Sequence, residues 1–402
     1  MLPDGWVETA LAGHVRIHAG VAPGTLRLCN AGSIPYVKVE DLNNCDKRQM
    51  ESREYLQSSR ATVPANSVIF PKRGAAIFAN KMRIAGRPLV LDTNLMAVET
   101  LGDIDPEFFY YAISHAGLHK LADTSTIPQL NNKHIYPHRL ARPGIVEQAR
   151  IAAILSTWDD AIAVTERLLA NSRRQKQALI GNLFVHSRHS GASHANWSFV
   201  DLDSVFERVT RKNHSGNTNV LTISGTRGLV SQLEYFNKSV ASENLTGYTL
   251  LHRNEFAYNK SYSDGYPMGA IKPLARYESG VVSSLYICFR FRDGFEADPD
   301  FFRHYFEAGM LNEGLSGIAQ EGARNHGLLN VGIGDFFKLR LHIPGIEEQR
   351  RIAAVINMAE GKEQLIEAQI AKLHDEKCAL MQQLLTGKRR VRLPQSAEAE
   401  PA

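Results

Sequence analysis

One stretch of thirteen residues occurs twice in this chain, and it constrains the fold more than any other feature. The segment "PGIVEQARIAAIL" at 143–155 returns as "PGIEEQRRIAAVI" at 344–356, with nine of thirteen positions identical. The two copies begin 201 residues apart in a chain of 402 residues, so they divide it into equal halves. A single repeat of this size indicates duplication of a whole structural unit, not a solenoid of short repeats.

The similarity between the halves extends in both directions. Upstream, "DPEFFYYAISHAG" at 105–117 resembles "DPDFFRHYFEAGM" at 298–310, at a spacing of 193 residues. Each half therefore consists of a variable region followed by a common tail. Downstream, at the spacing of 201, the matching residues are Lys176, Ala178, Leu179 and Leu183 with Lys377, Ala379, Leu380 and Leu384.

Both tails are predicted to be long helices, because each begins at a Pro-Gly pair and contains no further proline. Positions spaced alternately by four and three residues form a stripe that is apolar at seven of ten positions in the first tail and eight of ten in the second. At a rise of roughly 1.5 Å per residue, each helix is about 60 Å long and cannot bury its stripe in its own small domain. The stripes are Ile151, Leu155, Trp158, Ile162, Thr165, Leu169, Ser172, Lys176, Leu179 and Leu183, and Ile352, Ile356, Ala359, Glu363, Ile366, Ile370, Leu373, Lys377, Leu380 and Leu384.

The two stripes are expected to pack on each other as a two-stranded coiled coil. Either orientation is sterically possible with a whole domain between the helices, and we predict the antiparallel one. The polar interruptions Lys176, Lys377, Ser172 and Glu363 either set the register and accept partner helices, or are solvated positions on an imperfect stripe.

The variable regions are predicted to be mixed α/β domains. Four segments carry β-branched and aromatic residues bounded by Gly, Asn and Asp: "IPYVKVEDL" (34–42), "LVLDTNLMAVE" (89–99), "TNVLTISG" (218–225) and "VSSLYICFRFRDG" (282–294). Asp105 and Asp298 are predicted N-caps, each with a proline in the first helical turn. The chain is thus an α+β protein with five parts: domain 1 (1–142), long helix 1 (143–187), domain 2 (188–343), long helix 2 (344–390) and a flexible tail (391–402).

Composition narrows the class of protein. The chain is 44% apolar, has no run of 18 apolar residues, and begins with "MLPDGWVETALAG", which lacks a signal-peptide pattern. We expect a cytoplasmic protein. The four cysteines form no CxxC pair, and the "HSRHSGASH" cluster (186–194) is interpreted as an interdomain linker, so no metal site is expected. A net charge of +4 permits nucleic-acid binding without requiring it.

Catalytic motifs are missing from the sequence. Asp105-Pro106-Glu107 and Asp298-Pro299-Asp300 lack the second proline of the Asn/Asp-Pro-Pro-aromatic methyltransferase motif. The segment "TGKRR" (386–390) lacks the first glycine and the Ser or Thr of a phosphate-binding loop. No HExxH or GxSxG motif occurs. We therefore expect no catalytic residues in this chain.

The layout resembles the specificity subunit of type I restriction-modification systems, in which two target recognition domains are each followed by a long helix. The resemblance covers nearly the whole chain and is strongest in the two helices. It is carried by the "PGIxEQxRIAA" starts, by "LVLDTNLMAVE" and "VSSLYICFRF", which are each followed by Asp-Pro-acid-Phe-Phe, and by the ending "LMQQLLTGKRRV" (380–391).

This resemblance implies a non-catalytic subunit that binds double-stranded DNA. Such a subunit reads a bipartite target, one half per domain, and docks two methyltransferase subunits and, where the system has them, restriction subunits. It implies no cofactor on this chain, S-adenosylmethionine in the methyltransferase subunit and ATP in the restriction subunit. Three alternatives stay open. The chain is a self-contained restriction or methylation enzyme whose catalytic motifs are too degenerate to see, a cytosolic coiled-coil adaptor that binds protein, or the specificity subunit of a related type II restriction-modification complex.

Candidate DNA contacts combine positive charge with amides and flexible loops. Lysine and arginine would mostly bind phosphates, whereas asparagine, serine and some arginines would read base edges. In domain 1, "FPKRGAAIFANKMRIAGR" offers Lys72, Arg73, Asn80, Lys81, Arg83 and Arg87. In domain 2, the candidates are Arg208, Arg211, Lys212, Asn213 and His214 in "RVTRKNHSGNTN", and Tyr258, Asn259, Lys260, Tyr262, Ser263 and Lys272 in "FAYNKSYSDGYPMGAIKPLARY".

Overall fold

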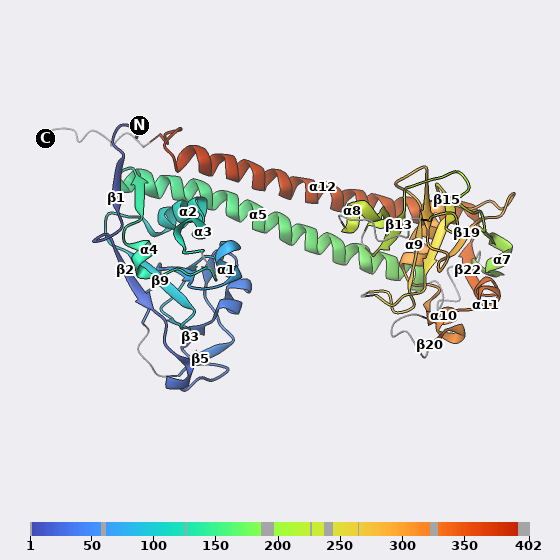
Figure 1. Ribbon diagram of the computed structural model, residues 1–402, viewed down its shortest axis with the longest axis horizontal. Helices are drawn as coiled ribbons and strands as arrows, with labels where there is room; N and C mark the ends of the chain where they lie inside the picture. The colour runs from blue at the N-terminus through green and yellow to red at the C-terminus, as the bar shows by residue number, and fades with distance from the viewer. Residues whose placement is uncertain are drawn as a thin grey trace. The chain divides into compact units, whose positions relative to one another are not determined.

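The computed structural model describes residues 2–57, 62–124, 127–185, 197–225, 227–236, 244–263, 265–321 and 329–392 (Figure 1). The histidine cluster at 186–194 lies outside these residues. The chain forms two compact units: unit 1 is Met1–Leu168 with Ile366–Ala402, and unit 2 is Leu169–Leu365. In the described ranges, every helix is too short or too polar to cross a lipid bilayer.

Unit 1 contains a five-stranded sheet in the order β2-β9-β6-β7-β4, a three-stranded sheet β5-β3-β8, and an antiparallel pair β1-β10. Its helices are η1 (Pro23–Thr25), η2 (Val39–Asn43), α1 (Ala75–Phe78), α2 (Pro106–Ala116), α3 (Leu118–Leu121) and α4 (Asn132–Ile135). Its strands are β1 (Val7–Ala10), β2 (Val15–Ala19), β3 (Ile34–Val37), β4 (Arg48–Gln49), β5 (Glu54–Leu56), β6 (Val68–Pro71), β7 (Arg83–Ala85), β8 (Val90–Leu91), β9 (Leu95–Thr100) and β10 (Arg139–Arg142).

Unit 2 contains a four-stranded sheet in the order β12-β19-β16-β17 and the antiparallel pairs β11-β22, β13-β14, β15-β18 and β20-β21. Its short helices are α7 (Leu202–Val205), α8 (Gln232–Phe236), α9 (Pro299–Glu307), α10 (Asn312–Ile318) and α11 (Ile333–Phe337). Its strands are β11 (Trp197–Asp201), β12 (Phe206–Arg208), β13 (Leu221–Ser224), β14 (Gly228–Ser231), β15 (Thr249–His252), β16 (Phe256–Asn259), β17 (Ala270–Pro273), β18 (Ser279–Val282), β19 (Ile287–Phe291), β20 (Gln320–Glu321), β21 (Leu329–Asn330) and β22 (Arg340–Pro344).

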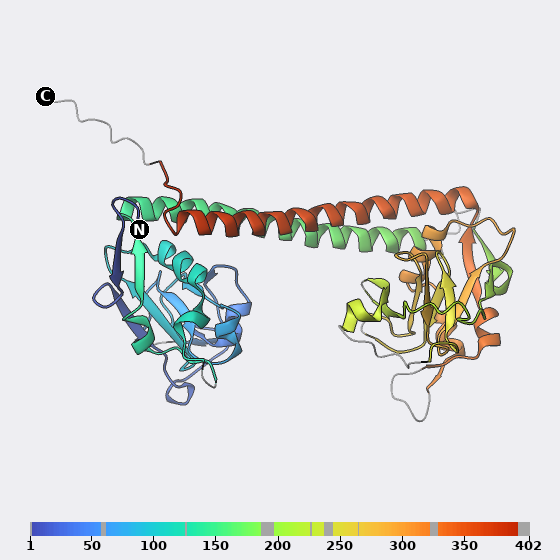
Figure 2. The same cartoon turned by 45° about the horizontal axis from the view of Figure 1, so that its top comes forward.

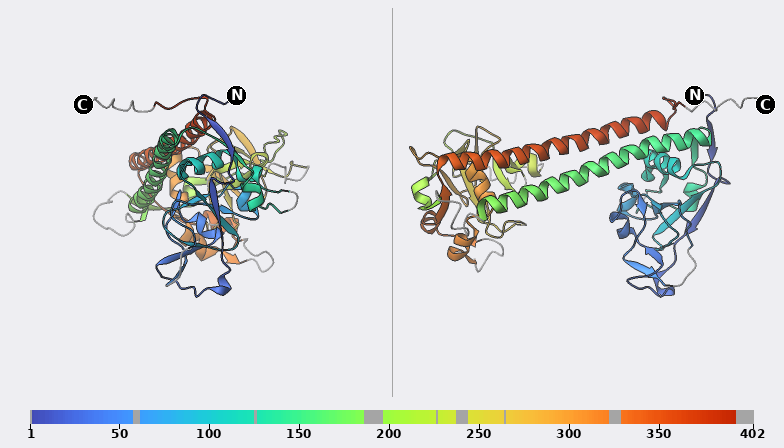
Figure 3. Two further views of the ribbon diagram at one scale, coloured as in Figure 1. Left: turned by 90° about the vertical axis from the view of Figure 1, so that its left-hand side faces the viewer. Right: turned by 180° about the vertical axis from the view of Figure 1, so that it is seen from behind.

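The repeated tails are the long helices α5 (Ile145–Ile180, continued by the π-helical turn η3, Gly181–Val185) and α12 (Ile346–Leu384). They lie side by side in every view (Figure 2, Figure 3). Within unit 1, Glu147 pairs with Arg390 and Asp159 pairs with Lys377, so residue numbers rise along α5 as they fall along α12. The antiparallel pairing and the α+β class are therefore confirmed, whereas the bounds of the five predicted parts stay predictions.

Three of the four polar interruptions of the stripes form ion pairs with the opposite helix, and the fourth is buried. In unit 2, the Lys176 ammonium lies 2.7 Å from a carboxylate oxygen of Glu363, which is only 10% exposed at its side chain. In unit 1, Lys377 forms an ion pair with Asp159. Lys377 lies 201 residues after Lys176, which is the spacing of the repeat. Ser172 is buried. A lysine at the same repeat position in each helix thus reaches a carboxylate on the opposite helix, which favours a role in setting the register.

The Asp-Pro-acid-Phe-Phe motifs begin equivalent helices and supply both cores. The Asp105 and Asp298 carboxylates each accept a backbone N–H three residues later, both at 2.8 Å, which confirms the predicted N-caps. The paired phenylalanines that follow are completely buried in both units. In unit 1 they lie with sheet residues and the first turns of α5 in one core, and in unit 2 with the equivalent part of α12.

The two units share a central three-stranded arrangement that their sequences barely reveal. Strand β6 lies between β9 and β7, and β16 lies between β19 and β17. Each central strand follows an asparagine, Asn66 or Asn254, with φ of 67°. The N–H of Asn66 donates to Ala85 at 2.7 Å, and the N–H of Asn254 donates to Leu274 at 2.8 Å. These matched turns place residues of the two domains in structural correspondence at a spacing of 188.

Candidate nucleic-acid interface

A buried glutamine from the repeated motif fastens each domain to its long helix. In unit 1, Gln148 is completely buried and its Nε2 donates to the carbonyl of Pro143 at 2.8 Å and to that of Asp103 at 3.1 Å. Its Oε1 accepts the backbone N–H of Asp105 at 2.9 Å. One side chain therefore joins the end of β10, the loop before α2 and the first turn of α5.

Gln349 repeats this arrangement in unit 2. Its Nε2 donates to the carbonyl of Pro344 at 2.9 Å, and its Oε1 accepts the backbone N–H of Asp298 at 3.1 Å. The side chain is buried, as that of Gln148 is. The duplicated "PGIxEQ" sequence therefore encodes a duplicated docking contact, which fixes the orientation of each domain on its own helix.

A polar cluster makes a second contact between domain and helix in unit 1. Tyr111 of α2 donates to Asp159 of α5, and burial, together with this hydrogen bond, raises the pKa of the Tyr111 phenol far above its usual value. The phenol is therefore a neutral donor. The Lys47 ammonium lies 3.1 Å from the Tyr111 oxygen and 2.6 Å from the Ser156 hydroxyl, while Lys377 of α12 pairs with the same aspartate.

Unit 2 has a different set of side chains at the matching positions. His304, Asn357 and Glu360 stand where unit 1 has Tyr111, Ser156 and Asp159, at the spacings of 193 and 201. The His304 ring lies 2.8 Å from the Asn357 amide oxygen, and Arg303 donates to Glu360 at 2.9 Å. Burial, with the charge of Arg303 adding to it, lowers the pKa of His304 below its usual value.

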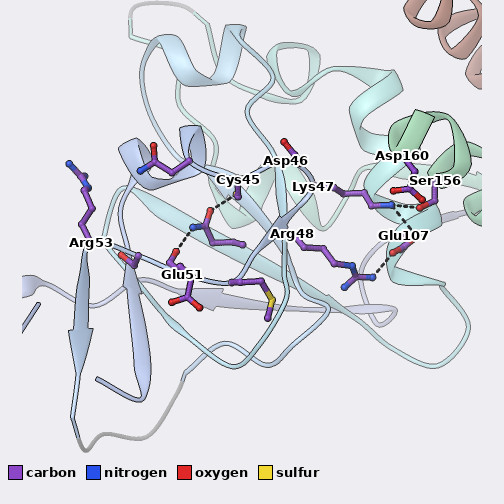
Figure 4. A pocket seen from close by; sticks show the side chains of 13 residues that line it. Cys45, Asp46, Lys47, Arg48, Glu51, Arg53, Glu107, Ser156 and Asp160 are labelled. Atoms are coloured by element: carbon purple, nitrogen blue, oxygen red, sulfur yellow. Dashed lines mark hydrogen bonds and ion pairs between the residues drawn. The ribbon is translucent and has the colours of Figure 1, made fainter. Parts of the chain in front are cut away.

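A cavity of about 630 Å³ opens beside the unit 1 cluster, between the 44–53 loop and helices α2 and α5 (Figure 4). Arg48 forms an ion pair with Glu107, and Lys47 lies 3.5 Å from the same carboxylate. The carboxylate of Asp160 also lines the cavity. Because the cations here already face carboxylates, the cavity is a poor site for a phosphate, and the DNA candidates are found elsewhere.

Two of the candidates in domain 1 have their polar groups engaged within the fold. Asn80, which adopts a φ of 50°, donates to the Ser114 carbonyl at 2.8 Å and accepts the backbone N–H of Leu118 at 3.0 Å. Its amide joins the short helices α1 and α3. Lys81 donates to the Asn43 side chain at 2.6 Å, but this bond is exposed and leaves the ammonium accessible.

The two later arginines of domain 1 also bind backbone carbonyls. Arg83 donates to the Cys45 carbonyl at 3.1 Å and to that of Met82 at 2.7 Å. Arg87 donates to the Ser33 carbonyl at 2.6 Å. Both guanidiniums hold neighbouring loops in place, which is a structural function that the sequence pattern did not distinguish from DNA contact.

Most of the first cluster in domain 2 is likewise occupied. Arg211 forms two bonds to the Glu255 carboxylate, at 3.1 and 3.0 Å, and a third to the Leu250 carbonyl at 3.2 Å. Lys212 donates to the Gly247 carbonyl at 2.9 Å. Arg211 therefore joins strand β15 to the residue before β16, whereas Lys212 keeps an exposed ammonium.

Two of the predicted contacts in domain 2 are wrong because the side chains are buried. Tyr258 is completely buried, stacks on Phe336 with ring centroids 5.3 Å apart, and donates to the Met268 carbonyl at 2.8 Å. Asn213 is 3% exposed, and its amide binds the backbone of Asn217 through both its nitrogen and its oxygen. A tyrosine suits a buried site as well as a surface, because it joins a large apolar ring to one hydroxyl group.

The prediction for Lys272 is also wrong. The residue is 7% exposed, and its ammonium forms an ion pair with Glu307 at the end of α9. It lies 2.9 Å from the Gly225 carbonyl and 4.7 Å from the centre of the Tyr266 ring. Lys272 therefore joins β17 to the loops around it, and its charge is compensated inside the unit.

The remaining candidates lie in loops or at exposed strand ends. Lys72 and Arg73 follow the central strand β6, and the N–H of Gly74 donates to the Pro128 carbonyl at 3.0 Å, which brings the 127–131 segment beside them. In the described part of the chain, neither cation has an ion pair or a side-chain hydrogen bond. In domain 2, the accessible candidates are Arg208 at the end of β12, His214, Asn259 at the end of β16, and the residues Lys260, Tyr262 and Ser263 that follow it.

Sequence reasoning missed two exposed apolar side chains near Lys72 and Arg73 in domain 1. Phe78 at the end of α1 is 59% exposed, and Ile127 in the adjoining segment is 64% exposed. Tyr262 of domain 2 has a similar exposure of 62%. Large apolar groups next to accessible cations suit contact with bases and thymine methyl groups. No sequence pattern identified them, because a single large apolar residue predicts burial.

Comparison with known proteins links these features to one family. Residues 3–171 match the family model described as the type I restriction modification DNA specificity domain. The type I restriction enzyme MjaIX specificity subunit of Methanocaldococcus jannaschii is 22% identical over 188 residues, which are 44% of this chain and 42% of the relative. The match therefore spans less than half of that relative's length.

Two solved structures share the fold over nearly the whole chain. The S subunit of a type I restriction-modification system from M. genitalium matches with a TM-score of 0.52 at 13% identity, covering 96% of this chain and 97% of that one. A chain from a type I R-M system, solved to explain complex assembly and conformational transition, matches with a TM-score of 0.62 at 15% identity, covering 97% and 100%. Residues 3–171 thus resemble the type I restriction modification DNA specificity domain, and the chain as a whole has the fold of the S subunit of a type I restriction-modification system.

Proposed function

We propose that this chain is the DNA sequence-specificity subunit of a type I restriction-modification system. The observation that carries the proposal is the duplicated docking of two domains on two antiparallel helices, in a chain whose first unit matches the DNA specificity domain. A chain built this way presents two separate binding surfaces from one scaffold. The same observation favours DNA specificity over a protein-binding adaptor.

The two domains would each read one half of a bipartite DNA target. Each domain is fixed to its helix by a buried glutamine and a polar cluster, so its loops are held in a constant orientation relative to that helix. Constant orientation matters because a bipartite target requires a defined distance between the bases read at its two ends. The helices would act as the spacer that sets this distance.

The chemistry would belong to partner subunits. Two methyltransferase subunits would dock on the helical region and supply S-adenosylmethionine, and restriction subunits, where the system has them, would supply ATP. This chain would bind no cofactor and contribute no catalytic residue. Its contribution is affinity for double-stranded DNA and the choice of sequence.

Methylome sequencing tests the proposal. A methylation-free bacterial host expresses this chain, the neighbouring methyltransferase gene, or both together. We expect a split motif to be methylated only when both are present, and we expect replacement of residues 1–142 by the domain of a relative to change one half of the motif. Methylation by this chain alone, or a soluble complex with an active methyltransferase that leaves the DNA unmodified, would contradict the proposal.

A further inference from the structure

One lysine occupies the same structural position in both domains, although the loops that carry it differ. Lys72 follows β6 and Lys260 follows β16, and each lies six residues after the asparagine with φ of 67°. The carbonyl of Lys72 accepts the N–H of Leu130 at 2.9 Å, and that of Lys260 accepts the N–H of Leu329 at 3.0 Å. The two sites therefore share the preceding asparagine turn and this backbone hydrogen bond.

Both ammonium groups remain available for a ligand. Lys72 and Lys260 are partly exposed, and neither makes an ion pair or a side-chain hydrogen bond to any residue that the structure describes. This contrasts with Lys272, whose charge is compensated by Glu307. A cation that no described residue neutralises, at a position repeated in two diverged domains, points to a ligand group that is the same for both domains.

The residues after the two lysines differ in size and charge. Arg73 and Gly74 follow the first lysine, whereas Ser261 and Tyr262 follow the second. The phosphate backbone of DNA is the same at every sequence, while the base edges change from one half-site to the other. An identical cation in both domains therefore suits the phosphate backbone, and the different residues beside it suit the base edges.

We propose that Lys72 and Lys260 are equivalent phosphate contacts, one for each half of the DNA target, and that the side chains beside them choose the bases. This inference rests on the proposed function and deepens it. Each lysine anchors its domain on the backbone independently of sequence. Arg73 with the exposed Phe78, and Tyr262 with Ser263, are then the side chains that face the base edges.

The test measures binding of the full chain to a mixed-sequence DNA duplex across a salt series. Lys72→Gln and Lys260→Gln each remove one charge, so each is expected to lower the slope of log K against log salt by about one and to weaken binding about eightfold near 0.1 M salt. Lys72→Arg and Lys260→Arg keep the charge and are expected to restore both. Lys338→Gln, at an exposed lysine after α11, is the matched control and is expected to change neither.

The outcomes separate this inference from the proposed function. If the unchanged chain binds DNA with a steep salt dependence and both glutamine variants bind as it does, the lysines are not phosphate contacts and the inference is overturned while the proposed function stands. If the unchanged chain does not bind duplex DNA with or without its methyltransferase partner, the proposed function itself fails. Far-ultraviolet circular dichroism of each variant verifies folding, so that a loss of binding with a native spectrum and rescue by arginine supports the inference.

In the methylome assay, the lysine variants are expected to lower the extent of methylation at every site without changing the motif. Arg73→Gln is expected to change the bases accepted in one half of the motif only, and Tyr262→Ala those in the other half. A lysine variant that changes the motif would overturn the division between backbone contact and base reading.

Discussion

The docking glutamine of unit 1 offers a sharp test of how the repeated motif works. Replacing Gln148 by leucine keeps a similar volume but removes three hydrogen bonds, to Pro143, Asp103 and the Asp105 N–H. The bond to Pro143 is buried, and the other two are partly accessible to water. The variant therefore tests whether these bonds, and not only the packing, hold the domain on its helix.

The magnitude follows from the groups left without partners. A buried polar group that loses its hydrogen bond costs about 1–3 kcal/mol, and water can partly satisfy the two accessible groups. We expect Gln148→Leu to destabilise the contact between α2 and α5 by about 2–4 kcal/mol. Because every 1.4 kcal/mol is roughly a factor of ten, hydrogen exchange of the α2 amides would accelerate by at least about 30-fold.

Hydrogen–deuterium exchange with mass spectrometry is the suitable assay, because a chain of two units need not unfold in one step. The segment 103–116 reports on unit 1 and 298–307 on unit 2. Gln382→Leu makes the same chemical change at an exposed position of α12 and serves as the control. Gln349→Leu, which breaks two bonds, should act on unit 2 alone and by a smaller amount. Equal exchange of segment 103–116 in the Gln148 and Gln382 variants would refute the reasoning.

Three further predictions follow from buried ionisable groups. Lys176→Met alone should destabilise unit 2, because it leaves the 10% exposed Glu363 unpaired. Adding Glu363→Leu should recover the denaturation midpoint, and a double variant with the same midpoint as the single variant would argue against this. The pKa of His304 is lowered in the fold, so the unfolded chain takes up the proton first as the pH falls. The contribution of neutral His304 to the free energy of unfolding is therefore intact above the unfolded pKa of about 6.5 and is lost as the pH falls toward the folded pKa. His304→Tyr, the residue of unit 1, should flatten this part of a stability-against-pH curve, and an unchanged curve would contradict it. Lys272→Gln should lower the thermal midpoint with an unchanged salt slope of DNA binding, since its charge faces Glu307; a reduced slope with an unchanged midpoint would contradict this assignment.

Local patterns predicted the elements whose signals depend on nearby residues. The Asp-Pro motifs predicted helix starts correctly because an N-cap needs only a carboxylate and the N–H three residues later. The stripes predicted two paired helices because a helix of that length cannot bury its own apolar face. Each predicted strand segment contains a strand, although Val39–Asn43 forms a helical turn where the first segment was expected to continue.

The candidate DNA contacts were harder to predict, since a basic or amide side chain looks the same in sequence whether it faces solvent or another strand. Asn213, Tyr258 and Lys272 are buried because partners distant in the chain surround them. The match between Lys72 and Lys260 is equally invisible, because their flanking sequences have diverged and only the turns before the central strands are shared.

The sequence by itself determined the duplication, the two long helices, the helix caps and the absence of familiar catalytic motifs, because each of these depends on residues close together in the chain or on a recognisable repeat. Only the tertiary structure decided which glutamine bonds hold the domains, which carboxylates the stripe lysines meet, and which cations are left accessible. The physical reason is that burial and pairing are properties of the space around a side chain. That space is filled by strands and helices from far along the sequence.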